Sequence, residues 1–261
     1  MSKNKRQDEI LEILKKEGFV GVRELGERLY ASQPTVRRDL DWLEKEGLVR
    51  RSHGGAILVG DAVKTPVSYR KGKRIREKIC ISRLAATLIE SDHLIFVDAS
   101  STALHLSDHI KESDGVTVVT NGVLMCQSLA DQGVRVFSTG GRLVGESMAF
   151  VGRVAEKTVS GFNADIMFFS SSSLGSDGMI SDYAEEETSL RLAMHARSRR
   201  SVFLCDSAKF DRCSPFCLLE LKNVDYVVTD APLPEVMLQG QGLRLLKSEQ
   251  GAYMYKNDRT E

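Results

Sequence analysis

The chain has 261 residues, of which 42% are hydrophobic and 28% are charged. This length allows one to two domains, and this composition excludes a disordered tail. The formal net charge is zero, but residues 1–73 hold 16 Lys and Arg against 11 Asp and Glu, whereas the remainder holds 20 against 25. A basic first part joined to an acidic second part suggests that only the first part approaches a polyanion.

Cysteines and apolar runs narrow the class of protein further. The five cysteines are an odd number and lack the paired spacing of a zinc site, so we expect reduced core thiols and no metal or cofactor. The N-terminus lacks the apolar stretch of a signal peptide, and no apolar run approaches the length of a membrane span. These features predict a cytoplasmic protein that does not contact a membrane.

The first thirty residues predict two helices. Apolar residues recur at helical spacing from Ile10 to Leu14, and Gly18 can end that helix in a left-handed conformation. Apolar residues from Val22 to Leu29 mark a second, short helix. Two helices followed by a brief turn and a third helix match the helix-turn-helix arrangement, which we place at about residues 20–39.

The third helix has the properties of a DNA-recognition helix. Ser32 can cap its first free N–H groups, and Pro34 suits a first helical turn. Val36, Leu40 and Leu43 form an apolar stripe that faces a core. The polar side chains that point away from this stripe belong to Gln33, Thr35, Arg37 and Arg38. A short helix with an apolar back and an Arg-rich N-terminal front fits the major groove of DNA.

A basic hairpin is predicted directly after this helix, which should end near Glu46. Residues 48–51 indicate a strand, Ser52-His53-Gly54-Gly55 a tight turn, and residues 56–59 a return strand. Such a hairpin is a wing, and its basic side chains can reach phosphates or a minor groove. The predicted DNA-contacting residues are Ser32, Gln33, Thr35, Arg37, Arg38, Arg50, Arg51 and His53.

These residues resemble the N-terminal domain of the DeoR family of bacterial transcriptional regulators. The similarity runs from Ser32 to Leu40, continues with Leu43-Glu44 and Gly47, and ends with residues 51–56. Ala31 and Trp42 are small departures from the family pattern. The resemblance implies a winged helix-turn-helix DNA-binding domain, which we place at residues 1–58.

A linker at residues 59–73 and a larger domain at 74–235 are expected next, with a C-terminal tail at 236–261 that includes one strand near Tyr253. The β-rich runs of the larger domain are residues 94–97, 116–119, 134–137, 166–169, 202–205 and 226–228. Its helical stretches include residues 102–110, 122–130 and 185–197. Strands that alternate with helices predict an α/β fold with a mostly parallel sheet.

Small polar residues follow these strands. The strand exits are residues 98–102, 120–122, 138–141, 170–173 and 206–209. Ligands of open parallel sheets bind beyond the carboxyl ends of the strands, and hydroxyls and amides there can hold an anion. Lys209 adds a point charge for a phosphate, while Asp98 and Asp206 can accept hydrogen bonds from sugar hydroxyls. The pattern predicts a site for a small anionic ligand.

The larger domain also resembles the C-terminal domain of the DeoR family, which is similar to ribose-5-phosphate isomerase and related sugar-phosphate enzymes. The matching segments are Asp98–Thr102, Val119–Asn121, Gly140-Gly141, Val151-Gly152, Asp165 with Phe169, Glu187–Met194, and Asp206 with Lys209-Phe210. The resemblance implies a repressor whose DNA affinity changes when a phosphorylated sugar binds this domain. The predicted effector-binding residues are Asp98, Ser100, Ser101, Thr102, Thr120, Asn121, Gly140, Gly141, Glu187 and Lys209.

One DNA-binding domain covers too few base pairs for useful specificity. We therefore expect a homo-oligomer, a dimer or a tetramer, on a double-stranded operator. The chain departs from the family's Ser-Gly-Thr-Thr pattern at Ala99–Thr102, and Ser170 and Arg191 replace a usual Gly and Lys. Two alternatives stay open. One is a ligand-independent regulator whose second domain only oligomerises. The other is a sugar-phosphate isomerase with Asp98, Glu187 and Lys209 as its acid and base groups, although a winged reader has no evident use in an enzyme.

Overall fold

The computed structural model describes residues 3–17, 19–52, 54–58 and 67–258. The chain divides into two compact units, Met1–Lys73 and Arg74–Glu261, called here the reader unit and the sensor unit. Gly18, His53 and residues 59–66 lie outside the described residues. The sequence predicts a helix end at Gly18, a DNA contact at His53 and the beginning of the linker at residues 59–66.

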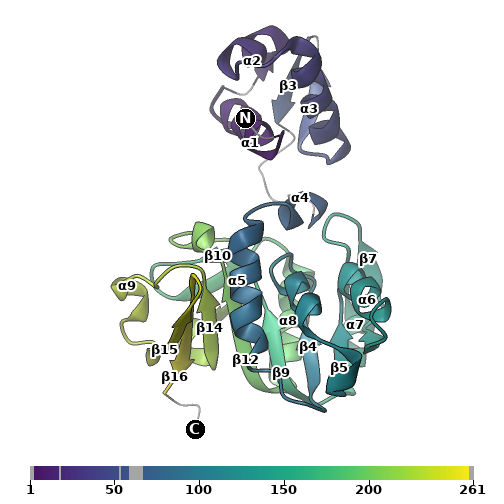
Figure 1. Cartoon of the computed structure of the whole chain (residues 1–261), viewed down its shortest axis with the longest axis vertical. Helices are drawn as coiled ribbons and strands as arrows, with labels where there is room; N and C mark the ends of the chain where they lie inside the picture. The colour runs from purple at the N-terminus through teal and green to yellow at the C-terminus, as the bar shows by residue number, and fades with distance from the viewer. Residues whose placement is uncertain (1–2, 18, 53, 59–66, 259–261) are drawn as a thin grey trace. The chain divides into compact units, whose positions relative to one another are not determined.

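The reader unit is a winged helix-turn-helix, as predicted (Figure 1). Its elements are α1 Lys3–Glu17, β1 Phe19–Gly21, α2 Val22–Arg28, α3 Gln33–Lys45, β2 Val49–Ser52 and β3 Gly55–Leu58. Strand β3 pairs antiparallel with both β1 and β2. The predicted apolar stripes of all three helices meet in one core, where Ile10, Leu25 and Leu40 are fully buried. Strand β1 was not predicted, because a run of three residues shows no periodicity.

A short helix, α4 (Val67–Lys71), lies inside the segment that the sequence assigned to the linker. Val67 at its start is buried, and Arg70 and Lys71 lie in its last turn. Cations there interact favourably with the negative end of the helix dipole. Five residues are too few to produce a recognisable helical repeat in the sequence, which explains the difference.

The sensor unit is built on a mostly parallel sheet, which confirms the predicted α/β class. Its strands are β4 Leu94–Val97, β5 Thr117–Thr120, β6 Arg135–Ser138, β9 Ala164–Phe169, β12 Ser198–Cys205, β14 Tyr226–Thr229, β15 Leu243–Glu249 and β16 Ala252–Asn257. Within the described residues their order is β15-β16-β14-β12-β9-β4-β5-β6. The pairings from β14 to β6 are parallel, whereas β15 and β16 are antiparallel. Residues 236–261, which the sequence predicts to be a C-terminal tail, thus supply two strands of this sheet.

Helices cover both faces of the sheet (Figure 1). One face carries α5 Ile75–Ala86, the 3-10 helix η1 Ala103–His109 and α6 Val123–Ala130; the other carries α7 Arg153–Ser160, α8 Glu185–Ala196 and α9 Glu235–Leu238. Strand β9 serves both cores, because Ile166 and Phe168 face one and Met167 and Phe169 face the other. Each of these fully buried side chains contributes about 1.5–3 kcal/mol of hydrophobic stabilisation.

Several short strands were not predicted. The hairpin of β7 (Arg142–Val144) and β8 (Ala149–Val151) stands beside the main sheet, and β10 (Ser173–Leu174), β11 (Met179–Asp182) and β13 (Phe216–Glu220) form a small second sheet. Strand β13 is an edge strand that buries Leu218 and exposes Cys217. All five cysteines are free, but Cys213 and Cys217 are exposed, which corrects the expectation that the thiols lie in the core.

The edges of the main sheet are poorly suited to further strand pairing. Strand β15 shifts its register against β16 between Leu245 and Lys247, so Leu246 occupies a bulge. Leu245 and Leu246 are 53% and 49% exposed. At the other edge, β6 is only four residues long and exposes Arg135 and Phe137. Short and bulged edge strands discourage pairing with another chain.

Candidate functional site

The N-terminal turn of α3 has the predicted geometry. Ser32 is extended and caps the helix, with its Oγ accepting a hydrogen bond from the Thr35 N–H at 3.4 Å. Tyr30, in the turn before it, has a left-handed φ of +49° and is almost fully exposed. Gln33 is exposed and Thr35 is half-buried at the front of this turn. The cap and the turn therefore present the start of α3 to solvent.

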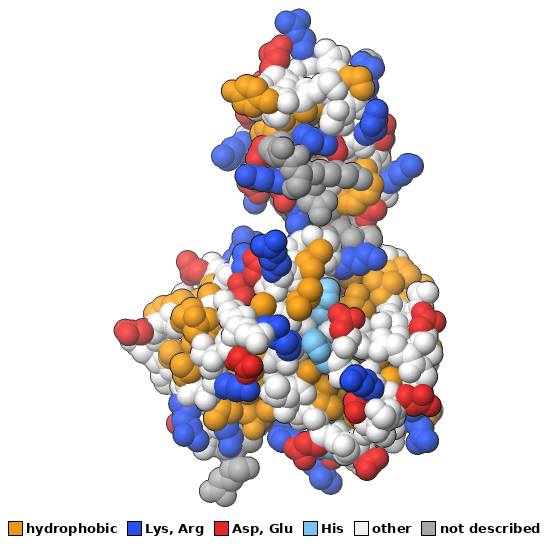
Figure 2. Space-filling model, in the orientation of Figure 1, with side chains coloured by type: hydrophobic (Ala, Val, Ile, Leu, Met, Phe, Trp, Pro, Cys, Tyr) orange, Lys and Arg blue, Asp and Glu red, His pale blue; other side chains and the backbone are white. Residues whose placement is uncertain are grey.

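Three arginines form the exposed cationic front of the reader unit. Arg37 and Arg38 lie on α3 and Arg50 on the first wing strand, and all three side chains are exposed. Within the described residues none of them has a hydrogen-bond or ion-pair partner. Figure 2 shows basic side chains spread over the visible face of this unit, with acidic ones between them. Unpaired guanidinium groups at the start of a recognition helix can bind base edges or phosphates.

Arg51 is placed differently. Its guanidinium donates to the carboxylate of Asp41, and its backbone N–H donates to Glu44 Oε1 at 2.8 Å. Both acceptors lie on α3, so Arg51 joins the wing to the recognition helix. A phosphate contact by Arg51 would have to compete with this ion pair. His53 lies outside the described residues.

A buried aspartate that sequence reasoning missed fixes α3 to α1. Asp39 is almost fully buried and accepts hydrogen bonds from Arg6 and, at 3.3 Å, from Gln7 Nε2. The hydrogen bond with Asp39 raises the pKa of Arg6 even though burial opposes it. The sequence does indicate this burial, because Asp39 lies three residues after Val36 and so on the apolar face of the helix.

In the sensor unit, the parallel strands end at one edge of the sheet, called here the carboxyl edge. Asp98 follows β4, Asn121 follows β5, Ser170 follows β9 and Asp206 follows β12. The Ser170 N–H donates to Asp98 Oδ2 at 3.3 Å. The topology thus brings predicted residues from separate strand exits into direct contact.

Arg191 organises one end of this edge. Its Nε donates to Asp98 Oδ2 at 2.7 Å, and its two terminal nitrogens reach Asp182 Oδ2 at 2.8 Å and Glu187 Oε2 at 3.3 Å. Burial alone lowers the pKa of Arg191, but the carboxylates of Asp182, Asp98 and Glu187 outweigh it and raise the pKa above its ordinary value. Three carboxylates face one guanidinium, so this group, called here the acidic end, carries excess negative charge.

Cations gather at the other end. Lys209 Nζ donates to Ser170 Oγ at 2.7 Å and lies 3.5 Å from Asp206 Oδ2, while the buried Lys78 of α5 donates to Ser101 Oγ at 3.0 Å. Burial raises the pKa of Asp206, but Lys209, Lys78 and Arg74 outweigh it and hold that pKa below its usual value. Sequence reasoning missed Lys78 and Arg74. We call Lys78, Lys209, Arg74, Asp206 and Asp230 the basic end.

The loop between the two ends is partly occupied by its own hydrogen bonds. The Ser100 N–H donates to Asp98 Oδ1 at 3.1 Å, and Ser100 Oγ accepts from the Ala103 N–H at 3.1 Å. Thr120, also predicted as an effector contact, is fully buried and accepts from the Gly122 N–H at 3.0 Å. These hydrogen bonds shape the two strand exits and leave Ser100 and Thr120 with less capacity to bind a ligand.

Two buried side-chain oxygens near the exits of β4 and β5 lack a hydrogen-bond partner in the described part of the chain. Among the described residues, no hydrogen bond reaches Thr102 Oγ1 or Asn121 Oδ1. The amide nitrogen of Asn121 donates to the Phe150 carbonyl at 3.1 Å. A buried polar atom left without a partner is unfavourable by about 1–3 kcal/mol. Both atoms are therefore strong candidates for contact with a bound polar molecule.

The predicted glycines lie farther along the same edge. Gly140 and Gly141 have φ of +60° and +109°, which favour glycine. A Cβ on Gly141 would lie 2.6 Å from the Val151 carbonyl oxygen, whereas a Cβ on Gly140 would meet nothing within 4 Å. Gly141 therefore permits close packing against β8, and no described contact joins either glycine to the acidic or the basic end.

Both parts of the chain match models of one protein family. Residues 6–61 match the DeoR-like helix-turn-helix domain, and residues 73–231 match the DeoR C-terminal sensor domain. The chain belongs to the DeoR family of transcriptional regulators. An uncharacterized HTH-type transcriptional regulator YgbI from Escherichia coli K12 is 32% identical, with 88% of this chain and 91% of that protein covered. The glycerol-3-phosphate regulon repressor of the same strain is 30% identical, with 92% and 95% covered.

Among solved structures, a ribose 5-phosphate isomerase from Plasmodium falciparum has a TM-score of 0.37 and 12% identity, with 52% of each chain covered.

For this DeoR-family regulator, the helix-turn-helix match identifies the first part as a DNA-binding module. Both relatives, YgbI and the glycerol-3-phosphate regulon repressor, are transcriptional regulators. Within the described residues, no helix combines the length and the apolar character needed to cross a lipid bilayer.

Proposed function

We propose that this DeoR-family regulator is a repressor that releases its operator when a phosphorylated sugar binds the carboxyl edge of the sensor unit. The observation that carries the proposal is the separation of charge along that edge. A phosphate suits the basic end, where Lys78 and Lys209 reach the hydroxyls of Ser101 and Ser170. Sugar hydroxyls suit the acidic end, whose carboxylates accept hydrogen bonds.

The relatives support a sugar-related role. The glycerol-3-phosphate regulon repressor and a putative aga operon transcriptional repressor, both from Escherichia coli, cover most of this chain at 30% and 27% identity. The two unpartnered atoms, Thr102 Oγ1 and Asn121 Oδ1, lie at the exits of β4 and β5 and would gain a partner from a polar effector. We assign the phosphate to the basic end and Asn121 to the sugar.

The reader unit is proposed to bind operator DNA through the front of α3 and the wing. Gln33, Arg37 and Arg38 would contact base edges or nearby phosphates, and Arg50 would bind the backbone. Binding as a dimer or tetramer would place two readers on half-sites about one helical turn apart. The ligand-independent alternative is supported by the internal hydrogen bonds of Ser100, which occupy part of the expected phosphate loop.

The test starts from duplexes selected out of a random pool by the full-length protein. Electrophoretic shift of a selected duplex should weaken by about 1–3 kcal/mol in Arg38→Ala if Arg38 makes a bidentate base contact. Arg244→Ala, a change at an exposed arginine of the sensor unit, is the matched control. A protein that selects no sequence would refute the DNA-binding proposal.

Effector release is tested on the same duplex with a panel of sugar phosphates and the corresponding free sugars. A phosphorylated sugar should release the wild-type protein, and Lys209→Met should still bind the duplex but resist release. Lys222→Met, at a more exposed lysine paired with Glu220, should behave as wild type. Retention of the duplex with every sugar phosphate, without any thermal shift, would favour the ligand-independent alternative.

A further inference from the structure

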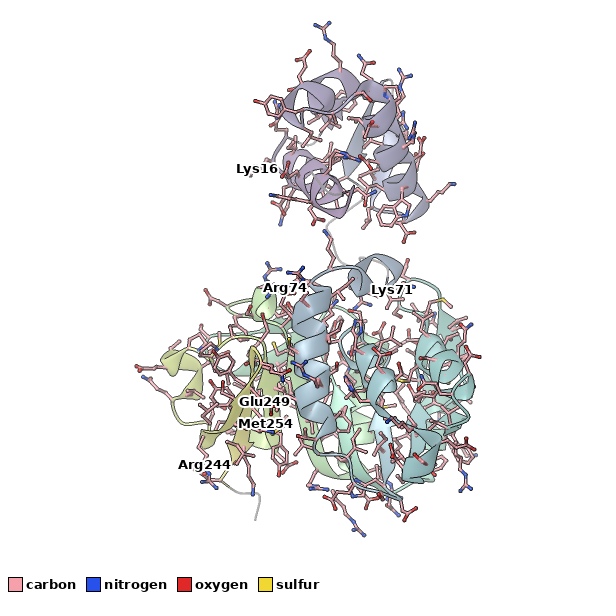
Figure 3. All side chains as sticks on the ribbon, viewed as in Figure 1. Lys16, Lys71, Arg74, Arg244, Glu249 and Met254 are labelled. Carbon is pink, nitrogen blue, oxygen red and sulfur yellow. The ribbon has the colours of Figure 1, made fainter. Side chains whose placement is uncertain are left out.

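The first residue of the sensor unit has an unusual backbone conformation. Arg74 precedes α5 with φ +49° and ψ +44°, in the left-handed region that residues other than glycine seldom adopt. Figure 3 shows Arg74 at the N-terminal end of α5. Such a conformation persists only where surrounding contacts hold it. Lys73, the residue before it, is the last residue of the reader unit.

The side chain of Arg74 supplies those contacts at the carboxyl edge. One terminal nitrogen donates to Asp230 Oδ2 at 2.6 Å and to Ser207 Oγ at 2.9 Å. Asp230 in turn accepts from the Ser207 N–H at 2.6 Å. Because Ser207 follows β12 and Asp230 follows β14, Arg74 connects the beginning of α5 to two strand exits.

Arg74 also approaches Asp206, which directly follows β12, but this contact is incomplete. Its Nε lies 3.4 Å from Asp206 Oδ1 and is buried, yet it makes no hydrogen bond within the described part of the chain. Asp206 is shared, because its other oxygen lies 3.5 Å from Lys209 Nζ. Arg74 Nε is thus an unsatisfied buried donor beside a carboxylate, Asp206, that also interacts with Lys209. If Lys209 moves away from Asp206, the interaction between Asp206 and Arg74 can become stronger.

We propose that Arg74 couples the effector site to the segment that leads to the reader unit, an inference that rests on the function proposed above. An anion bound to Lys209 draws the lysine away from Asp206 and repels that carboxylate. Asp206 then pairs more closely with Arg74 Nε, which satisfies the buried donor and fixes the first turn of α5. Coupling of this kind is reciprocal, so loss of Arg74 also weakens anion binding.

The test uses hydrogen exchange of the full-length protein in inorganic phosphate, with chloride at equal ionic strength as the reference. The informative amide is that of Lys78, which donates to the Arg74 carbonyl at 3.1 Å and closes the first turn of α5. Arg74→Gln removes the charge, and Arg74→Lys keeps the charge without the planar fork. Arg76→Gln is the matched control, because Arg76 is exposed on the same turn.

In the wild type and in Arg76→Gln, phosphate should slow exchange at Lys78 by a factor between about 5 and 150, the range typical of coupled sites. In Arg74→Gln, phosphate should protect residues 206–209 only at a higher concentration, because Arg74 belongs to the basic end. At the concentration that restores this protection, Lys78 should still exchange as fast as in chloride. Equal slowing at Lys78 in wild type and Arg74→Gln would overturn the coupling and leave the proposed function intact. Absence of protection at residues 206–209 in every protein would overturn the basic end as a phosphate site, and the coupling with it.

Circular dichroism establishes that each variant is folded. If Arg74→Gln does not fold, Arg74→Lys decides, because a lysine keeps a terminal cation that can bind Asp230 but lacks the Nε–H that lies beside Asp206. A reduced response at Lys78 supports the proposal, and a full wild-type response refutes it.

Discussion

Replacing Arg191 with leucine should destabilise the sensor unit strongly. The guanidinium holds Asp98, Asp182 and Glu187 together, and the side chains of Asp98 and Asp182 are only 1% and 9% exposed. Removing one partner of a buried ion pair leaves an uncompensated charge and lowers the free energy of unfolding by about 3–5 kcal/mol. Here two buried carboxylates lose the same partner, so we expect a loss in the upper part of that range.

The loss of unfolding free energy in Arg191→Leu should depend on pH in a defined direction. In the wild type, burial raises the pKa of Asp182, but Arg191, Ser172, the Tyr183 N–H and Lys209 outweigh it, so the folded pKa is lowered. A lowered carboxylate pKa contributes stability above the unfolded pKa and loses it as the pH falls through the folded value. Without Arg191, burial dominates and the folded pKa rises. The difference between variant and wild type should therefore be largest near about pH 7 and shrink toward about pH 4.

Urea unfolding can assign the loss to one unit. Trp42, the single tryptophan, lies in the reader unit, so its fluorescence follows that unit while circular dichroism also follows the sensor unit. The midpoint from tryptophan fluorescence should stay unchanged. Arg199→Leu, at an arginine whose side chain is 81% exposed, should change stability by less than about 1 kcal/mol. A loss below about 1 kcal/mol in Arg191→Leu at neutral pH would refute the view that this guanidinium neutralises the buried carboxylates.

Three further outcomes are expected. Asp39→Ala should lower the stability of the reader unit by about 1.5–3 kcal/mol, measured by tryptophan fluorescence in urea, because it removes a buried charged acceptor. Gly140→Ala should cost about 1–2 kcal/mol for its left-handed backbone, whereas Gly141→Ala should cost more because its Cβ meets a backbone oxygen at 2.6 Å; equal thermal melting points would contradict this. Mass spectrometry after brief alkylation of the folded protein should find Cys213 modified and Cys205 protected, since Cys205 is buried and burial raises the pKa of its thiol.

Much of the fold followed from local patterns. The apolar stripe of Val36, Leu40 and Leu43 and the Ser32 cap placed α3 correctly, and the run 94–97 coincides with β4. These elements are long or strongly patterned, so the sequence alone specifies them. The hairpin of β7 and β8 escaped prediction because its strands have three residues each and gain their stability from tertiary packing.

The charge pattern of the candidate site was less accessible. The sequence marks Asp98, Glu187 and Lys209 because they follow strands or match a family motif. The structure brings Asp98 and Glu187 onto one guanidinium. That shared partner comes from α8, far from Asp98 in the sequence. Arg74 was missed for the same reason, since its partners lie more than a hundred residues away. Long-range pairing of charges depends on topology, which periodicity alone does not supply.

The bulge at Leu246 has a consequence for assembly. A regular seven-residue border strand would offer a continuous row of free amides and carbonyls, on which another copy could extend the sheet without limit. The register shift interrupts that row and twists it locally. The oligomer proposed above would therefore form through helical or loop surfaces, in a closed complex of defined size and not as an open-ended fibre.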